Sequence, residues 1–126
     1  MTDGILLFAH GARDPDWARP FHEVQTRVAA LAPGCRVELA FLEFMEPTLL
    51  EAGDRLAAQG CTAVAVVPLF LGAGGHVRKD IPDLMARLQA RHAGVRWTLQ
   101  AAVGEQAAVI QAMAEAAVRP VRDTGS

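Results

Sequence analysis

Four short apolar runs alternate along the chain with four stretches of helical periodicity, and this alternation limits the fold more than any other feature. The apolar runs span residues 5–9, 37–44, 63–70 and 95–103, and the helix-like stretches span residues 15–31, 47–59, 76–91 and 105–118. Strands that alternate with helices form a mostly parallel sheet with right-handed crossovers. The sequence therefore predicts a three-layer α/β fold, in which helices cover both faces of a four-stranded, mostly parallel sheet.

Residues typical of helix ends flank these stretches. An acidic residue precedes a proline at two of the starts, Asp14-Pro15 and Glu46-Pro47. Proline is favoured at the first position of a helix, so the predicted helices begin at these prolines. Gly60 follows the second stretch, where glycine commonly ends a helix.

The bulk properties describe one globular domain. A chain of 126 residues lies within the roughly 100–200 residues usual for a domain. The formal net charge of −2 provides no field that would attract nucleic acid. The first apolar run is too short for a signal peptide or a membrane span, so we expect a cytoplasmic protein with no membrane partner. We expect residues 1–118 to form the domain and residues 119–126, which lack periodicity, to form a flexible tail.

Polar and charged residues follow the ends of three predicted strands. Ligands of parallel α/β sheets bind beyond the carboxyl ends of the strands. His10 follows the first strand, Glu43 ends the second, and a glycine-rich loop and His76 follow the third. Glu43 has the same parity as the apolar residues of its strand, so a buried carboxylate there would need a cationic partner. Imidazole and carboxylate ligands suit iron, cobalt, nickel and zinc.

Each of these residues has an ordinary structural explanation when it is considered alone. His10 and His76 could be hydrogen-bonded residues at a strand end and a helix start, and Glu43 could simply reach solvent. Glu46 could stabilise the amino terminus of the next helix. The joint placement favours a metal site made by His10, Glu43 and His76, and leaves open whether Glu43 or Glu46 is its acidic residue.

The glycine-rich loop LGAGGH has neither the dinucleotide-binding nor the P-loop spacing of glycines, so no nucleotide is expected. Gly74 and Gly75 would instead allow the backbone to approach a broad, flat ligand closely. Arg13, Arg78 and Lys79 should line the same crevice, where cations can pair with carboxylates. These residues therefore predict a binding site for a polyanionic substrate that accepts a metal.

Three segments carry a resemblance to a known family. ILLFAHGARDP, VELAFLEFMEPTL and VVPLFLGAGGHVRKDIP, in this order, resemble the small single-domain sirohydrochlorin cobaltochelatases. These are class II chelatases of cobalamin biosynthesis, related to the sirohydrochlorin ferrochelatases of sirohaem (porphyrin-type) synthesis. The resemblance spans residues 5–118 and implies a chelatase fold and an ATP-independent lyase whose short members pair as homodimers. Ala12 is a departure, because many relatives have serine there.

The resemblance also implies roles for individual residues. His10 and His76 would bind the metal and accept pyrrole protons, with Glu43 as their acidic partner. The expected function is insertion of a divalent ion into sirohydrochlorin, with Co2+ as the first choice and Fe2+ or Ni2+ as alternatives. Two readings of other classes remain open: a phosphohistidine carrier that uses one histidine, and a non-catalytic metal-binding protein.

Overall fold

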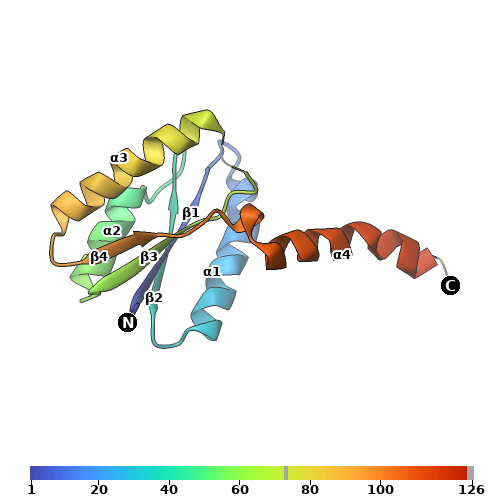
Figure 1. Cartoon of the computed structure of the whole chain (residues 1–126), viewed down its shortest axis with the longest axis horizontal. Helices are drawn as coiled ribbons and strands as arrows, with labels where there is room; N and C mark the ends of the chain where they lie inside the picture. Colours follow the sequence, from blue (N-terminus) through green and yellow to red (C-terminus); the bar gives the residue numbers. More distant parts are fainter. Residues whose placement is uncertain (73, 125–126) are drawn as a thin grey trace.

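A parallel sheet of four strands forms the centre of the structure (Figure 1). The computed structural model describes residues 1–72 and 74–124. The strands are β1 (Gly4–Ala9), β2 (Arg36–Phe41), β3 (Ala63–Pro68) and β4 (Arg96–Leu99). They lie in the order β2-β1-β3-β4, and all three pairings are parallel. The predicted α/β fold with a four-stranded parallel sheet is confirmed.

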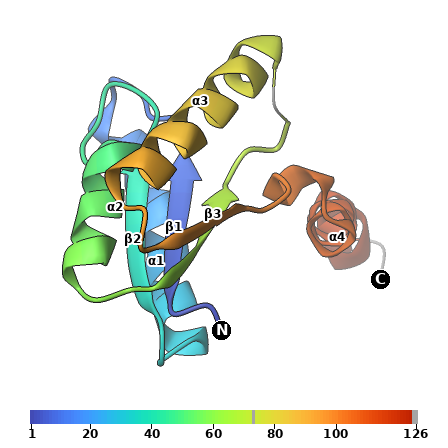
Figure 2. The ribbon, with the colours of Figure 1, turned by 60° about the vertical axis from the view of Figure 1, so that its left-hand side comes forward.

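Helices cover the two faces of the sheet unequally. Helices α2 (Leu49–Ala58) and α3 (Gly75–Arg91) pack on one face, and α1 (Arg19–Leu31) packs on the other (Figure 2). The chain moves from β1 outward to β2, and then back across β1 to β3 and β4. Because right-handed crossovers in opposite directions place their helices on opposite faces, α1 is separated from α2 and α3.

Two hydrophobic clusters fill the spaces between the layers. The larger cluster lies under α2 and α3, and its buried residues include Leu6, Phe8, Leu56, Val66, Leu88 and Trp97. The smaller cluster lies under α1 and contains the buried residues Leu7, Ala9, Ala18, Leu39 and Phe41. Successive side chains of β1 alternate between the two clusters. This burial on both faces explains why residues 5–9 are apolar without interruption.

The starts of the first two helices differ from the prediction. Residues 15–18 form a 3-10 turn, η1 (Pro15–Ala18), whose N-cap Asp14 accepts a hydrogen bond from Asp16 N–H before α1 begins. Helix α2 begins at Leu49, because the Thr48 hydroxyl and the Glu51 carboxylate form a capping box. Pro47 therefore precedes the helix and follows a cis peptide bond.

The C-terminal region differs most from the prediction. Strand β4 ends at Leu99, and a short 3-10 turn, η2 (Val103–Glu105), leads into α4 (Ala107–Thr124). The predicted helix end at Val118 is too early, so residues 119–124 continue the helix. The stretch was expected to lack periodicity, but Val121 continues the apolar spacing of α4. No helix in the described part of the chain is long and apolar enough to cross a membrane.

A carboxylate fastens the amino ends of β1 and β3. Asp3 accepts hydrogen bonds of 2.9–3.0 Å from the backbone N–H groups of Ala63 and Thr62 and from the Thr62 hydroxyl. The bonds from Ala63 and Thr62 hold the pKa of the Asp3 carboxyl below its ordinary value, because they favour the ionised form. The amino edge of the sheet is thus held by an ionised side chain.

A second polar cluster joins α2 to the end of α3. The Asp54 carboxylate accepts hydrogen bonds from the Arg91 guanidinium and lies 2.6 Å from His92 Nε2. The hydrogen bonds from Arg91 and His92 lower the pKa of Asp54. The half-buried ring of His92 contacts both Asp54 and Trp97. The contact fixes the C-terminal end of α3 against α2.

We predict that Asp3→Asn lowers the midpoint of thermal unfolding by a few degrees at pH 7. Ionised Asp3 stabilises the fold at pH values above its pKa in the unfolded chain, and this stabilisation is lost as pH falls through the lowered pKa of the folded state. The difference between the variant and the wild type should therefore be constant above about pH 5 and shrink below about pH 4. Circular dichroism melts across this range measure it.

Asp16→Asn is the matched control, because Asp16 forms only an exposed ion pair with Arg19. It should leave the unfolding midpoint nearly unchanged at every pH. A difference for Asp3→Asn that stayed constant down to pH 2.5, or roughly so, would contradict the assignment of this effect to an ionised carboxylate.

Candidate active site

The loops after β1 and β2 lie against each other at the carboxyl edge of the sheet. Leu42 N–H donates to the Ala9 carbonyl at 2.9 Å, and Glu43 N–H donates to the His10 carbonyl at 3.1 Å. These bonds continue the pairing of the two strands beyond their ends. They place His10 and Glu43 next to each other along the backbone, at the edge where parallel sheets bind ligands.

Gly11 permits this close contact. Its φ is +90°, in the region that favours glycine, and a Cβ at this position would lie 1.9 Å from the Glu43 carbonyl oxygen. No other residue type fits between the two loops without moving one of them. In the sequence pair His10-Gly11, the glycine is thus required by the packing of the two loops, and the histidine before it supplies the polar side chain.

The imidazole of His10 packs on an aromatic ring from a third loop. The ring centroids of His10 and Phe70 are 4.3 Å apart, and Phe70 is only 1% exposed. Phe70 follows β3 and also contacts Phe8. Among the described residues, none forms a hydrogen bond with the ring nitrogens of His10. The contact with Phe70 holds the ring, and both nitrogens lack a hydrogen-bond partner among these residues.

The conformation around Glu43 corrects the parity argument. Strand β2 ends at Phe41 and not at residue 44, so Glu43 lies in the following loop and is exposed. The strand ends early because Phe41 N–H donates to the Pro47 carbonyl and the loop between them turns back. Glu46 is also exposed, and Thr48 caps α2 in its place.

Phe44 is a residue of this loop that the sequence did not single out. Its φ of 65° is unusual for a bulky side chain, and its ring is 57% exposed. The Arg13 guanidinium carbon lies 4.9 Å from the ring centroid, which is a cation–π contact. In the sequence Phe44 ends the apolar run of residues 37–44, so no local pattern distinguishes it from the strand residues before it.

The predicted residues of the third loop are only partly described. Gly74 is the N-cap of α3, and the backbone of His76 lies in its first turn. Gly75 is the first residue of α3, and the side chain of His76 lies outside the described residues. Arg78 and Lys79 are exposed on α3. A Cβ on Gly74 would meet nothing within 4 Å, so the packing of the chain does not explain this glycine.

The described residues alone do not complete a metal site. No group of three His, Cys, Asp or Glu side chains among them could hold a metal ion. The predicted set contains His76, whose side chain is not described. The set of His10, Glu43 and His76 therefore stays a prediction.

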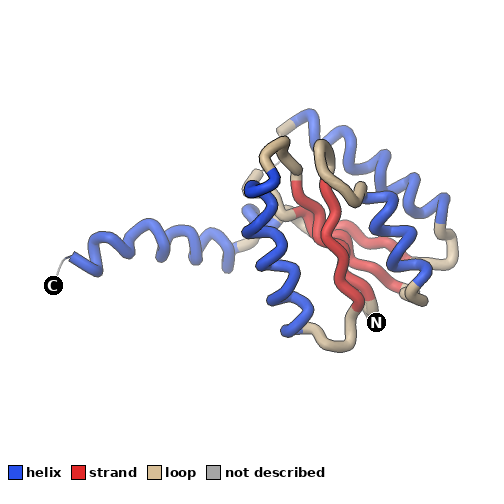
Figure 3. Tube along the Cα trace, turned by 180° about the vertical axis from the view of Figure 1, so that it is seen from behind, coloured by secondary structure: helices blue, strands red, loops and turns tan. Residues whose placement is uncertain are grey.

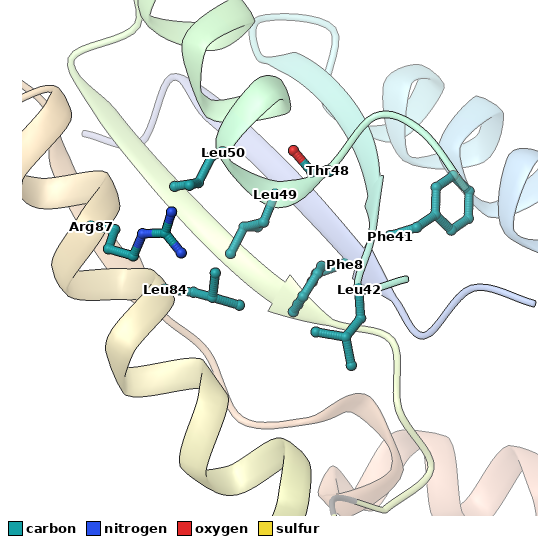
Figure 4. Close-up of a pocket in the computed structure, with 8 residues that line it drawn as sticks. All are labelled: Phe8, Phe41, Leu42, Thr48, Leu49, Leu50, Leu84 and Arg87. Atoms are coloured by element: carbon teal, nitrogen blue, oxygen red, sulfur yellow. The ribbon is translucent and has the colours of Figure 1, made fainter. Parts of the chain in front are cut away.

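A pocket of about 260 Å³ lies between α2, α3 and the start of the loop that carries Glu43 (Figure 4). Its wall is mostly apolar, and it is lined by Phe8, Phe41, Leu42, Thr48, Leu49, Leu50, Leu84 and Arg87. Arg87 is the one charged residue of this lining. The pocket joins the hydrophobic core to the carboxyl edge, and no sequence pattern predicted it.

Comparison with known proteins identifies the family. Residues 4–119 match the family model described as CbiX. The chain belongs to the CbiX family. The sirohydrochlorin ferrochelatase of Bacillus subtilis (strain 168) is 32% identical to this CbiX-family chain over 120 residues, which cover 90% of this chain and 43% of that protein. The sirohydrochlorin cobaltochelatase of Saccharolobus solfataricus is 40% identical over 85 residues, which cover 65% of this chain and 62% of that one. The chain thus spans less than two thirds of the length of these curated relatives.

Solved structures of CbiX-type proteins share the fold. A CbiX protein from Marinobacter aquaeolei VT8 superposes with a TM-score of 0.87 at 30% identity, over 100% of both chains. The sirohydrochlorin chelatase SirB from Bacillus subtilis subspecies spizizenii, in complex with cobalt, gives a TM-score of 0.80 at 30% identity over 91% of this chain and 49% of that chain. The chelatase-type fold expected from the sequence is confirmed.

We predict that Gly11→Ala separates the two loops that carry His10 and Glu43. The new Cβ would collide with the Glu43 carbonyl at a backbone conformation unfavourable to alanine, so the variant should lose about 1–3 kcal/mol of stability. Hydrogen exchange of the Glu43 amide, which donates to His10, should become faster.

Gly34→Ala is the control, because a Cβ on Gly34 would meet nothing within 4 Å. It should change neither the unfolding midpoint nor the exchange of the Glu43 amide. Equal stability of the two variants would contradict the packing role of Gly11.

Proposed function

We propose that this CbiX-family chain is a sirohydrochlorin chelatase, which inserts a divalent metal ion into the tetrapyrrole without ATP. The observation that carries the proposal is the pairing of His10 with Glu43 at the carboxyl edge of the sheet in a member of this family. Cobalt is the proposed ion, and the relatives that bear the names cobaltochelatase and ferrochelatase make iron the alternative. Nickel rests on ligand chemistry alone. The predicted cytoplasmic location belongs to the same proposal.

The reaction requires the protein to handle a metal and two protons. When a divalent ion enters the ring, two pyrrole N–H bonds break, two metal–nitrogen bonds replace them, and two protons leave. Neutral imidazole can bind a divalent ion or accept a proton near neutral pH. We assign both tasks to His10 and His76, with Glu43 as a third ligand or as the base that orients them. The contact with Phe70 supports this assignment, because it fixes the orientation of the His10 ring before substrate arrives.

The substrate is a flat ring with carboxylate side chains, and the edge of the sheet presents groups that suit both features. The exposed ring of Phe44 would stack on the face of the macrocycle. Arg13, Arg78 and Lys79 would pair with the peripheral carboxylates. Gly74 and Gly75 would let the loop backbone approach the ring, and the open space around Gly74 supports this.

The two other readings make different predictions. A phosphohistidine carrier would need no acidic partner for His10, and membership in the CbiX family weighs against it. A non-catalytic metal-binding protein would bind Co2+ without turnover of the tetrapyrrole. An insertion assay separates the three.

We predict that His10→Ala and His76→Ala each lower the rate of metal insertion by at least about 100-fold, since each removes a ligand and a proton acceptor. The measurement is an anaerobic absorbance assay with sirohydrochlorin and Co2+, Fe2+ or Ni2+ in parallel. His22→Ala is the control, because His22 is exposed on α1 and should keep the wild-type rate. Wild-type rates for both His10→Ala and His76→Ala would overturn the proposal.

We predict that Phe44→Ala raises the KM for sirohydrochlorin about 3- to 10-fold with a smaller effect on kcat, because stacking holds substrate and transition state alike. Arg13→Gln should act in the same direction through a lost charge pair. Leu31→Ala removes an apolar side chain that is even more exposed, at the far end of α1, and should leave KM unchanged. An unchanged KM for Phe44→Ala would remove this residue from the substrate site.

A further inference from the structure

Helices α2 and α3 lie side by side on one side of the sheet, and α1 lies on the other (Figure 3). The two helices are close together near the end of α3 (Figure 2). There, a Cβ on Gly53 would lie only 2.4 Å from Leu88 Cδ2, and Asp54 accepts hydrogen bonds from Arg91. Nearer their starts, the pocket of about 260 Å³ lies between the first turn of α2 and the middle of α3 (Figure 4). The helices thus form a wedge, with its narrow end closed by packing and the pocket at its wide end.

The size and the wall of the pocket limit what it can bind. Protein cores contain few voids larger than a water molecule, so a space of this size is not ordinary packing. It lies just below the range of roughly 300–1,000 Å³ that is usual for drug-sized ligands. Four leucines supply most of the wall, and Phe8 adds an aromatic ring from the sheet. The pocket therefore suits a short aliphatic chain and is too small for a tetrapyrrole ring.

Arg87 is the charged residue of this wall, and it is exposed on α3. Among the described residues it has no hydrogen-bond or ion-pair partner, and Asp83, one turn earlier, does not pair with it. Arg91, one turn later, is by contrast paired with Asp54. The hydroxyl of Thr48, the other polar side chain of the wall, already belongs to the capping box of α2. Arg87 is therefore the group that can hold the polar end of a ligand.

These features select a chemical class of ligand. A guanidinium binds a carboxylate through two parallel hydrogen bonds, and one guanidinium balances one negative charge. A phosphate group carries a charge of about −1.5 to −2 at neutral pH and offers three acceptor oxygens, which a single arginine does not satisfy. Leucine side chains beside one cation thus fit an aliphatic monocarboxylate better than a phosphate.

The pocket shares part of its wall with the candidate active site. Phe8 contacts Phe70 with ring centroids 5.7 Å apart, and Phe70 in turn packs on the ring of His10. Leu42, another residue of the wall, directly precedes Glu43. A carboxylate in the pocket would therefore lie behind the residues that present His10 and Glu43. A side arm of a tetrapyrrole at the site, or a separate small molecule, could supply it.

We propose that the pocket between α2 and α3 binds an aliphatic carboxylate, with its chain between the leucines and its carboxylate on Arg87. A carboxylate-bearing arm of the tetrapyrrole and a free short-chain monocarboxylate share this chemistry. The proposal does not rest on the proposed function, because metal binding and proton transfer are assigned to other residues.

The test uses the full-length chain and hexanoate as the probe. In carbon–proton correlation spectra, hexanoate should shift the methyl signals of Leu50 and Leu84 until the site is saturated. Arg87→Gln should weaken this binding at least about 10-fold, because it removes the charge that holds the carboxylate. Arg27→Gln is the matched control, since Arg27 is exposed on α1 and pairs with Glu23, and it should leave the affinity unchanged. Leu50→Phe fills the pocket with the charge intact and should also weaken binding at least about 10-fold.

Hexanol gives a second comparison, because it has the same chain without the charge. It should bind the wild type and Arg87→Gln with equal affinity. Pocket methyl signals that do not shift at up to about 20 mM hexanoate would overturn the proposal. Equal hexanoate affinity of the wild type and Arg87→Gln would overturn it as well. Circular dichroism melts confirm that each variant is folded.

Competition with sirohydrochlorin identifies the source of the carboxylate. If an arm of the tetrapyrrole occupies the pocket, sirohydrochlorin displaces hexanoate, and Arg87→Gln weakens the binding of both. If the occupant is a separate molecule, sirohydrochlorin and hexanoate bind together, and Arg87→Gln weakens the binding of hexanoate alone. Either result supports the site. A wild-type chain that inserts no metal would contradict only the proposed function, because hexanoate binding is measured without turnover.

Discussion

The structure depends on a pair of backbone hydrogen bonds just beyond the ends of β1 and β2. Through them Ala9 and His10 accept the amides of Leu42 and Glu43, and the two loops become one continuous surface. The approach is possible only because residue 11 has no side chain. The imidazole, the carboxylate and the exposed ring of Phe44 are therefore presented by backbone that the sheet itself holds in place. A site built this way needs little reorganisation when its ligands arrive.

The sheet was predictable because the relevant signals are local. Apolar runs of strand length between helical stretches specify a parallel sheet, and burial on both faces explains runs such as residues 5–9. Gly60, with a φ of +88°, lies just beyond α2 as expected of a residue that ends a helix. The position of His10 and Glu43 at one edge of the sheet was also predictable, because each residue follows the end of a strand and the strands are parallel. For the sheet, contacts between distant residues stabilise strands that the local sequence pattern already predicts.

The details that the sequence did not predict depend on contacts between residues that are distant in the sequence, or on unusual backbone conformations. The early end of β2 follows from the bond between Phe41 and Pro47, and the exposure of Phe44 follows from a left-handed conformation that no propensity scale assigns to phenylalanine. The extension of α4 past Pro120 could not be predicted from the sequence, because a proline usually ends a helix. The packing of His92 on Asp54 joins residues 38 positions apart, which no local pattern reveals.

The contact between Gly104 and the Leu71 carbonyl ties the base of α4 to the loop that leads to the glycines and His76. Any shift of that loop on ligand binding would be passed to the base of the helix, because there is no free space at the contact to absorb it. A ligand that favoured one arrangement of this loop would therefore also favour one position of the base of α4. Because Gly104 has no side chain, the loop after β3 and the base of α4 are in direct backbone contact, so a displacement of one displaces the other.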